Sequence, residues 1–114
     1  MNKLITLITF VFAFASTAFA ADSSAPAASK SLEELTAPCA ACHGPTGVSQ
    51  SGAFPTIAGQ HVSYLEKALL DYQSGERKNA IMAGQVTNLS KSDIEALAKY
   101  YANQEGPLYT PTYK

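Results

Sequence analysis

The feature that most constrains this chain is the run Cys39-Ala40-Ala41-Cys42-His43, which contains both of its cysteines. A Cys-x-x-Cys-His run is typical of covalent haem attachment. The spacing follows from the chemistry, because two thiols must each form a thioether with one of the two vinyl groups on the same porphyrin edge. On a helix, residues three and four positions apart share one face, which brings both thiols and the imidazole, as proximal iron ligand, together. We therefore expect one covalently bound haem c per chain.

The same pair of cysteines allows other interpretations. A bare Cys-x-x-Cys also occurs in thiol oxidoreductases and zinc sites, and in an oxidising compartment it forms a small disulfide. A Cys39–Cys42 disulfide leaves the adjacent His43 unexplained. A thioredoxin-like pair needs βαβ units, and no alternating strand pattern follows the first 20 residues. Haem attachment is the favoured interpretation.

The N-terminus has the three parts of a secretory signal. Lys3 supplies a positive charge, residues 4–15 are apolar and uncharged, and small residues lead to an Ala-x-Ala site that ends at Ala20. We expect a signal peptide over residues 1–20 and a mature protein in the periplasm, where covalent haem attachment takes place. The alternative is an uncleaved anchor, because residues 4–21 carry no charge and are just long enough to span a bilayer.

The mature chain is expected to form one small domain. Removal of residues 1–20 leaves 94 of the 114 residues, and loss of Lys3 shifts the net charge from −1 to about −2. This mild charge argues against a nucleic-acid-binding protein. We expect a flexible leader at 21–30, a domain at 31–106 and a tail at 107–114. We also expect a monomer without stable membrane insertion after signal cleavage.

The first half of the domain is expected to contain one helix and one long loop. Ser31 and Glu34 have the spacing of a capping box, so a helix should begin after Ser31 and run toward the cysteines. Pro38 interrupts this segment, and we expect the helix to kink or end near Ala37. Residues 44–59 are rich in Gly, Pro, Ser and Thr and should form a long loop that wraps a ligand.

Two more helices are expected in the second half. Residues 62–74 carry apolar side chains at helical intervals, and Gly75 is a suitable C-cap. Residues 76–84 are expected to be a loop with at most one short helical turn. A third helix should begin after Ser90 and end before Gly106. Its apolar stripe consists of Ile94, Leu97, Ala98 and Tyr101. The pattern predicts an all-α domain with three main helices.

An iron bound by one histidine needs a second axial ligand or has an open face. Once Met1 is removed, Met82 is the remaining methionine, and His61 is the only histidine besides His43. Met82 lies in a glycine-flanked segment between two expected helices, where the chain can return over the opposite haem face. We favour Met82 as the second ligand. An open or water-ligated iron and ligation by His61 are the alternatives, and a lone methionine is otherwise a soft core residue.

With these motifs in this order, the chain resembles the class I c-type cytochromes. It is similar in particular to short bacterial periplasmic monohaem cytochromes and to one half of the two-haem periplasmic cytochromes. A single Cys-x-x-Cys-His run excludes two haems on this chain. The matching segments cover nearly all of residues 35–104 and are 39–45, 54–60, 64–77, 79–82 and 89–101.

The resemblance implies a small class I cytochrome c fold, in which the first and last helices cross and long loops wrap around one covalent haem with an exposed edge. It also implies His43 and Met82 as axial iron ligands. In this family the proline twelve residues after the ligating histidine, here Pro55, offers its backbone carbonyl to the other imidazole nitrogen. Such a contact fixes the orientation and basicity of the ring.

Further residues are candidates for the surroundings of the haem. Arg77 is a candidate partner of a haem propionate, because Arg pairs well with carboxylates; Lys78 and Gln60 are weaker candidates, and a solvated surface position is the alternative for each. Eight other residues are candidates for pocket or core, two roles that periodicity alone does not separate. They are Phe54, Ile57, Tyr64, Leu65, Leu69, Ile81, Leu97 and Tyr101.

The expected function is electron transfer and not enzymatic catalysis. Two strong axial ligands leave no position for a substrate, and redox partners would meet the exposed haem edge in brief encounters. The expected donor is a protein such as a quinol-oxidising complex, and the expected acceptor is one such as a terminal oxidase or reductase. Two alternatives remain: a ligand-binding sensor or peroxidase-like enzyme with an open iron, and a fixed cytochrome subunit of a larger oxidoreductase.

Overall fold

Four helices form the described part of the chain in the computed structural model, which describes residues 30–108 and 111. These residues contain no strand, and none of their helices is long and apolar enough to cross a membrane. The expected signal peptide (1–20), nearly all of the leader (21–30) and most of the tail (107–114) lie outside the described residues. The helices are α1 (Leu32–His43), α2 (Val62–Ser74), α3 (Ala80–Val86) and α4 (Lys91–Ala102).

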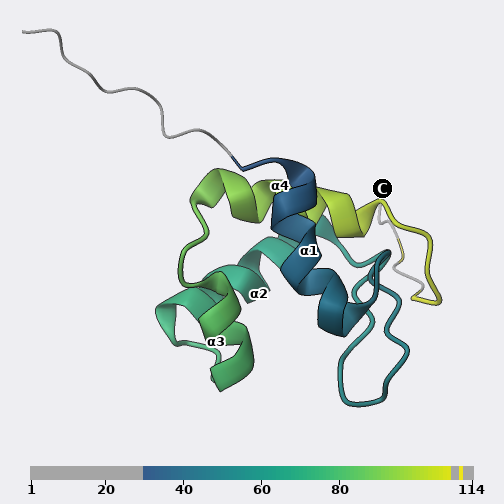
Figure 1. Ribbon diagram of the computed structural model, residues 1–114, viewed down its shortest axis with the longest axis horizontal. Coiled ribbons are helices and arrows are strands. Elements are labelled where there is room, and N and C mark those ends of the chain that lie inside the picture. Colours follow the sequence, from purple (N-terminus) through teal and green to yellow (C-terminus); the bar gives the residue numbers. More distant parts are fainter. Residues whose placement is uncertain (1–29, 109–110, 112–114) are drawn as a thin grey trace, which may run out of the picture.

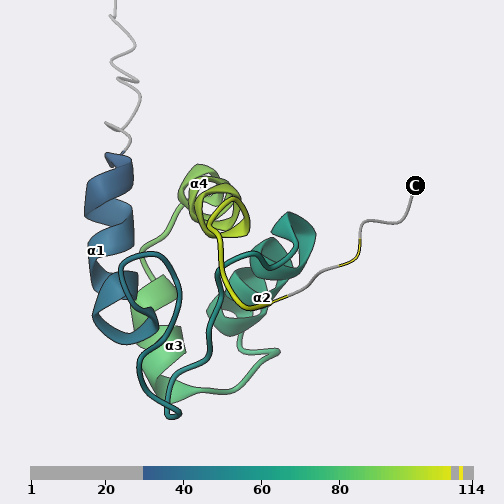
Figure 2. The ribbon, with the colours of Figure 1, turned by 90° about the vertical axis from the view of Figure 1, so that its right-hand side faces the viewer.

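The C-terminal helix α4 organises the packing. Helix α1 crosses α4, as the resemblance implies, and α2 packs against α4 from another side (Figures 1 and 2). Helix α3 packs against α2. The expected apolar stripe of α4 is buried along its whole length, so the helical period correctly identified the inward face. The buried core cluster joins three helices and consists of Leu35, Leu65, Leu97, Ala98 and Tyr101.

Helix α1 begins as predicted and continues past its proline. Ser31 Oγ accepts a hydrogen bond from the Glu34 N–H at 3.3 Å, and the Glu34 carboxylate accepts one from the Ser31 N–H at 2.7 Å. Of the two outcomes predicted at the proline, an end of the helix near Ala37 is wrong, because the helix includes Pro38 and runs to His43. A proline inside a helix costs a backbone hydrogen bond, but the cap and the packing on α4 outweigh this local cost.

Helix α2 has the predicted bounds, and α4 begins where predicted but ends at Ala102, short of the predicted stop at Gly106. Helix α2 ends at Ser74, and Gly75 follows with a left-handed φ of 84°. Helix α4 begins after Ser90, whose Oγ accepts from the Asp93 N–H at 3.2 Å. The Asp93 carboxylate in turn accepts from the Ser90 N–H at 2.9 Å, which completes a second capping box. Local sequence signals were therefore sufficient for α2 and for the beginning of α4.

Helix α3 is longer than the sequence predicts. Where at most one short turn was expected, residues Ala80–Val86 form a helix of seven residues. Asn79 caps it, because its Oδ1 accepts hydrogen bonds from the N–H groups of Ile81 and Met82, both at 3.0 Å. Met82 therefore lies on a helix and not in a loop. The missed signal was an asparagine directly before a short apolar run.

The predicted loop 44–59 is tied to itself and to α4. The Gly47 carbonyl accepts from the N–H groups of residues 57 and 58 at 2.8 and 3.1 Å, and the Gly59 N–H donates to the Tyr101 carbonyl at 2.9 Å. Gly47 has a φ of +83°, and a Cβ built on it would lie 2.7 Å from the Tyr101 ring. Only glycine allows the loop to approach α4 so closely.

We expect Gly47→Ala to lower the free energy of unfolding by about 2 kcal/mol or more. The positive φ alone costs an L-residue roughly 1–2 kcal/mol, and the added methyl group collides with Tyr101. Urea denaturation of the haem-loaded protein measures the loss. Gly52→Ala is the matched control, because nothing lies within 4 Å of a Cβ at Gly52, and it should change stability by less than about 0.5 kcal/mol. Equal losses in the two variants would contradict the argument.

Candidate functional site

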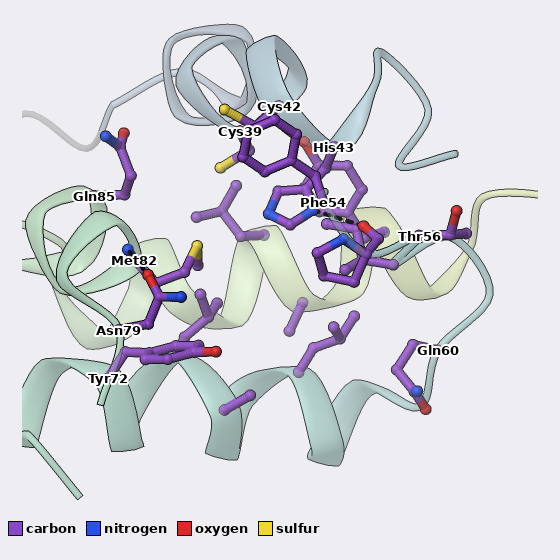
Figure 3. Close-up of a pocket in the computed structure, with 18 of the residues that line it drawn as sticks. Cys39, Cys42, His43, Phe54, Thr56, Gln60, Tyr72, Asn79, Met82 and Gln85 are labelled. Atoms are coloured by element: carbon purple, nitrogen blue, oxygen red, sulfur yellow. Dashed lines mark hydrogen bonds between the residues drawn. The ribbon is translucent and has the colours of Figure 1, made fainter. Parts of the chain in front are cut away.

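A cavity of about 410 Å³ lies between the four helices and loop 44–59 (Figure 3). Helix α1 supplies two thiols and an imidazole to one part of its wall, and α3 supplies a thioether from another direction. Apolar side chains of α2 and α4 form much of the remaining wall. All eight residues that the sequence predicted for the pocket or the core line the cavity. They are Phe54, Ile57, Tyr64, Leu65, Leu69, Ile81, Leu97 and Tyr101.

The two cysteines form no disulfide with each other, and both line this cavity. Cys39 and Cys42 lie in the last two turns of α1, and the three-residue spacing brings both sulfur atoms toward the same side of the helix (Figure 3). The Cys39 thiol contacts the Leu35 carbonyl oxygen at 3.6 Å. Burial raises the pKa of the Cys39 thiol. The site thus presents two neighbouring cysteine sulfur atoms to one apolar space.

The imidazole of His43 is buried and held in one orientation. Its Nδ1 lies 2.8 Å from the backbone carbonyl oxygen of Pro55. A carbonyl oxygen can only accept, so Nδ1 carries the hydrogen and Nε2 of the neutral ring is left with a free lone pair. Figure 3 shows Nε2 directed away from Pro55 into the cavity. The geometry therefore presents a nitrogen ligand at the end of α1.

Met82 lies across the cavity from His43. Its sulfur faces the cavity from α3, on the side toward which the His43 Nε2 points (Figure 3). The side chain is partly buried, and the Asn79 cap holds its backbone N–H. His61, the other histidine of the sequence analysis, is the exposed N-cap residue of α2 and is not among the residues that line the cavity.

Arg77 is fixed at the exposed side of the cavity by two aromatic residues. Its Nη1 donates to the Tyr64 hydroxyl at 3.2 Å, and its guanidinium carbon lies 5.0 Å from the centre of the Tyr72 ring. The hydrogen bond with Tyr64 raises the pKa of the guanidinium. Gln60 also lines the cavity, whereas Lys78 is not among its lining residues. Tyr72 also lines the cavity; the sequence placed it on the apolar face of its helix, but not among the predicted pocket residues.

The residues of this site lie in a segment that matches a known protein family. A family model described as Cytochrome c matches residues 33–104, which include the Cys-x-x-Cys-His motif, loop 44–59 and Met82. The chain belongs to the cytochrome c family.

Individual cytochromes show how far the similarity extends. Cytochrome c4 of Pseudomonas aeruginosa is 37% identical over 105 residues, which cover 92% of this chain and 50% of that protein. Cytochrome c-554(548) of Halomonas halodenitrificans is 37% identical over 76 residues, 64% of this chain and 92% of that protein. The crystal structure of reduced recombinant cytochrome c4 from Pseudomonas stutzeri matches with a TM-score of 0.56 and 42% identity, over 59% of this chain and 38% of that chain. The chain thus spans half or less of these two cytochrome c4 proteins.

The fold is accordingly that of a class I cytochrome, and the chain carries one haem c bound covalently at Cys39 and Cys42. The cavity fits this group, because it combines apolar walls with the two thiols and the imidazole.

We expect Cys39→Ala and Cys42→Ala each to remove one thioether, and the double variant to abolish covalent attachment. Haem staining after denaturing electrophoresis measures the covalent link. Much of the domain should unfold in the double variant, because a domain of this size buries little surface without its cofactor. Ala41→Ser is the control, since Ala41 lies between the cysteines on an exposed position. Retention of full haem staining by the double variant would contradict the attachment site.

Proposed function

We propose that this cytochrome is a periplasmic one-electron carrier whose haem iron is ligated by His43 and Met82. The observation that carries the proposal is the position of the His43 Nε2 and the Met82 sulfur on facing sides of one apolar cavity that both cysteines also line (Figure 3). When bound, haem supplies an iron that exchanges single electrons between its ferrous and ferric states. A ligand from the protein on each side leaves no coordination position for a substrate.

The side chains around the site favour the reduced state. A methionine sulfur stabilises ferrous iron and raises the reduction potential. Apolar walls from Leu65, Leu69 and Leu97 act in the same direction, because they disfavour net charge in the cavity. The hydrogen bond from His43 Nδ1 to the Pro55 carbonyl holds the ring in place and increases the basicity of Nε2. A site held in this way changes little between oxidation states, which favours rapid electron transfer.

Arg77 is proposed to pair with a haem propionate. Its guanidinium is already oriented by Tyr64 and stacked on Tyr72, so little side-chain freedom is lost when it binds a carboxylate. All three residues line the cavity. The stacked, hydrogen-bonded geometry favours Arg77 over its neighbour Lys78.

The domain organisation and the cellular setting are part of the same proposal. Residues 1–20 are proposed as a cleaved signal peptide, 21–30 as a leader, 31–106 as the cytochrome domain and 107–114 as a tail. Redox proteins are the proposed partners. A relative named thiosulfate dehydrogenase electron acceptor, from Stutzerimonas stutzeri, is 38% identical over 68 residues. Another, named cytochrome subunit of sulfide dehydrogenase, from Chlorobaculum tepidum, is 35% identical over 71 residues.

The second of these names favours one alternative, a cytochrome that is fixed in a larger oxidoreductase. Size-exclusion chromatography of a periplasmic extract at high salt distinguishes the two arrangements. A free monomer supports the mobile carrier, and co-elution with a larger redox enzyme supports the fixed subunit.

We expect the purified protein to show a covalent c-type spectrum when reduced and a weak long-wavelength sulfur-to-iron band when oxidised, without a response to carbon monoxide. Met82→Ala should abolish the sulfur band and admit carbon monoxide or cyanide. It should also lower the potential by at least about 60 mV, the change that shifts a one-electron equilibrium tenfold.

Ala83→Ser on the same helix is the control and should keep the band and the potential. A wild-type spectrum that shifts with carbon monoxide and lacks the sulfur band would reject the proposed ligation and favour a sensor or an enzyme with an open iron. An unchanged potential in Met82→Ala would remove Met82 from the axial position.

We expect Arg77→Gln to lower the reduction potential by tens of millivolts, because a positive charge close to the site favours electron uptake. Redox titration measures the change. Lys78→Gln removes the same charge one residue further along the chain, at a position outside the cavity wall, and should have less than half the effect. Equal shifts in the two variants would mean that Arg77 acts only as part of the general surface charge.

A further inference from the structure

The side-chain amide of Gln73 connects α2 to the end of the helix that carries Met82. Its Nε2 donates to the Val86 carbonyl oxygen at 2.9 Å and to the Leu89 carbonyl oxygen at 2.8 Å. A primary amide has two N–H groups, and both are used here. One side chain therefore joins the last residue of α3 and the turn after it to the neighbouring helix.

Helix α3 needs such support from its surroundings. It has seven residues, too few for a helix to be stable alone, and it includes Gly84, which weakens helix formation. Of the described helices, only α2 packs closely against it. Its single buried residue is Val86 at its C-terminal end. The apolar anchor and the Gln73 hydrogen bonds thus act at the same end of α3.

The opposite end of α3 is held by a second amide. Asn79 accepts hydrogen bonds from the Ile81 and Met82 N–H groups, so the backbone of Met82 is fixed directly. Met82 lies between this cap and the Gln73 contacts. No other described helix packs closely against α3, so loss of its contacts with α2 would leave α3 free to shift. Met82 lies on α3, and such a shift would carry its sulfur out of the cavity.

We infer that Gln73 is a positioning residue for Met82, which retains α3 against α2 and thereby keeps the Met82 sulfur at the iron. The inference rests on the proposed His43 and Met82 ligation. Gln73 touches neither the cavity nor the reacting atoms and acts only through the helix that it holds. Its loss should increase the fraction of time that the sulfur is released, without removal of the haem.

Cyanide binding to the oxidised, haem-loaded protein tests this inference, because cyanide occupies the position that Met82 must first leave. We expect Gln73→Ala to bind cyanide about tenfold faster, which corresponds to roughly 1.4 kcal/mol, and to weaken the sulfur-to-iron band. Gln73→Glu has the same shape, but an ionised carboxylate has no hydrogen to donate and repels the two carbonyl oxygens. It should accelerate cyanide binding at least as much as alanine.

Gln104→Ala is the matched control. Gln104 donates its side-chain amide to the Tyr100 carbonyl at 3.1 Å, on α4 and away from α3. Urea denaturation gives the stability of each variant, so that a general loss of stability is separated from a local release of Met82. Faster cyanide binding in the Gln73 variants but not in Gln104→Ala supports the inference.

If both Gln73 variants bind cyanide at the wild-type rate and keep the sulfur-to-iron band, the inference is overturned, but the proposed His43 and Met82 ligation is not affected. A wild-type rate in Gln73→Glu alone would also overturn it, since shape and not hydrogen bonding would then suffice. Absence of the sulfur band in the wild-type protein would instead reject the proposed ligation itself.

Discussion

The hydrogen bond between the His43 imidazole and the Pro55 carbonyl is the contact on which the rest of the site depends. It joins the end of α1 to the long loop, and the loop is joined to α4 through the Gly59 N–H and the Tyr101 carbonyl. Because the carbonyl accepts from Nδ1, the same contact determines which imidazole nitrogen faces the cavity. This hydrogen bond therefore connects α1 to the loop and also selects the imidazole tautomer whose Nε2 can bind a metal.

The core and the cofactor site of this cytochrome are not separate structures. Leu65, Leu97 and Tyr101 belong to the buried cluster that joins α1, α2 and α4, and the same residues line the cavity. Side chains on the inward faces of these helices thus have the cofactor as a packing partner. A chain of this size has little other apolar surface to bury, which is why covalent retention of the haem benefits stability as well as redox chemistry.

Short-range signals in the sequence predicted those parts of the structure that short-range contacts determine. Ser31 with Glu34, and Ser90 with Asp93, identified two helix starts, and the spacing of the cysteines and His43 identified one face of a helix. Pro38 led to the wrong prediction that α1 ends near Ala37. The packing energy that outweighs its local cost to the helix comes from α4, which lies more than 50 residues later in the chain. Helix α3 was underestimated because its local signal, the Asn79 cap, is short, and because further support comes from Gln73 on another helix.

The two capping boxes also make the crossed helices sensitive to acid. Hydrogen bonds from Ser31 lower the pKa of Glu34, and hydrogen bonds from Ser90 lower the pKa of Asp93. A carboxyl with a lowered folded pKa contributes stability above its unfolded pKa, and this contribution is lost as the pH falls through the folded value. Lys30 adds a smaller favourable charge to both groups and lies 3.9 Å from the Asp93 carboxylate. Protonation at acidic pH therefore weakens the beginnings of both α1 and α4, and with them the crossing that supports the haem-binding end of α1.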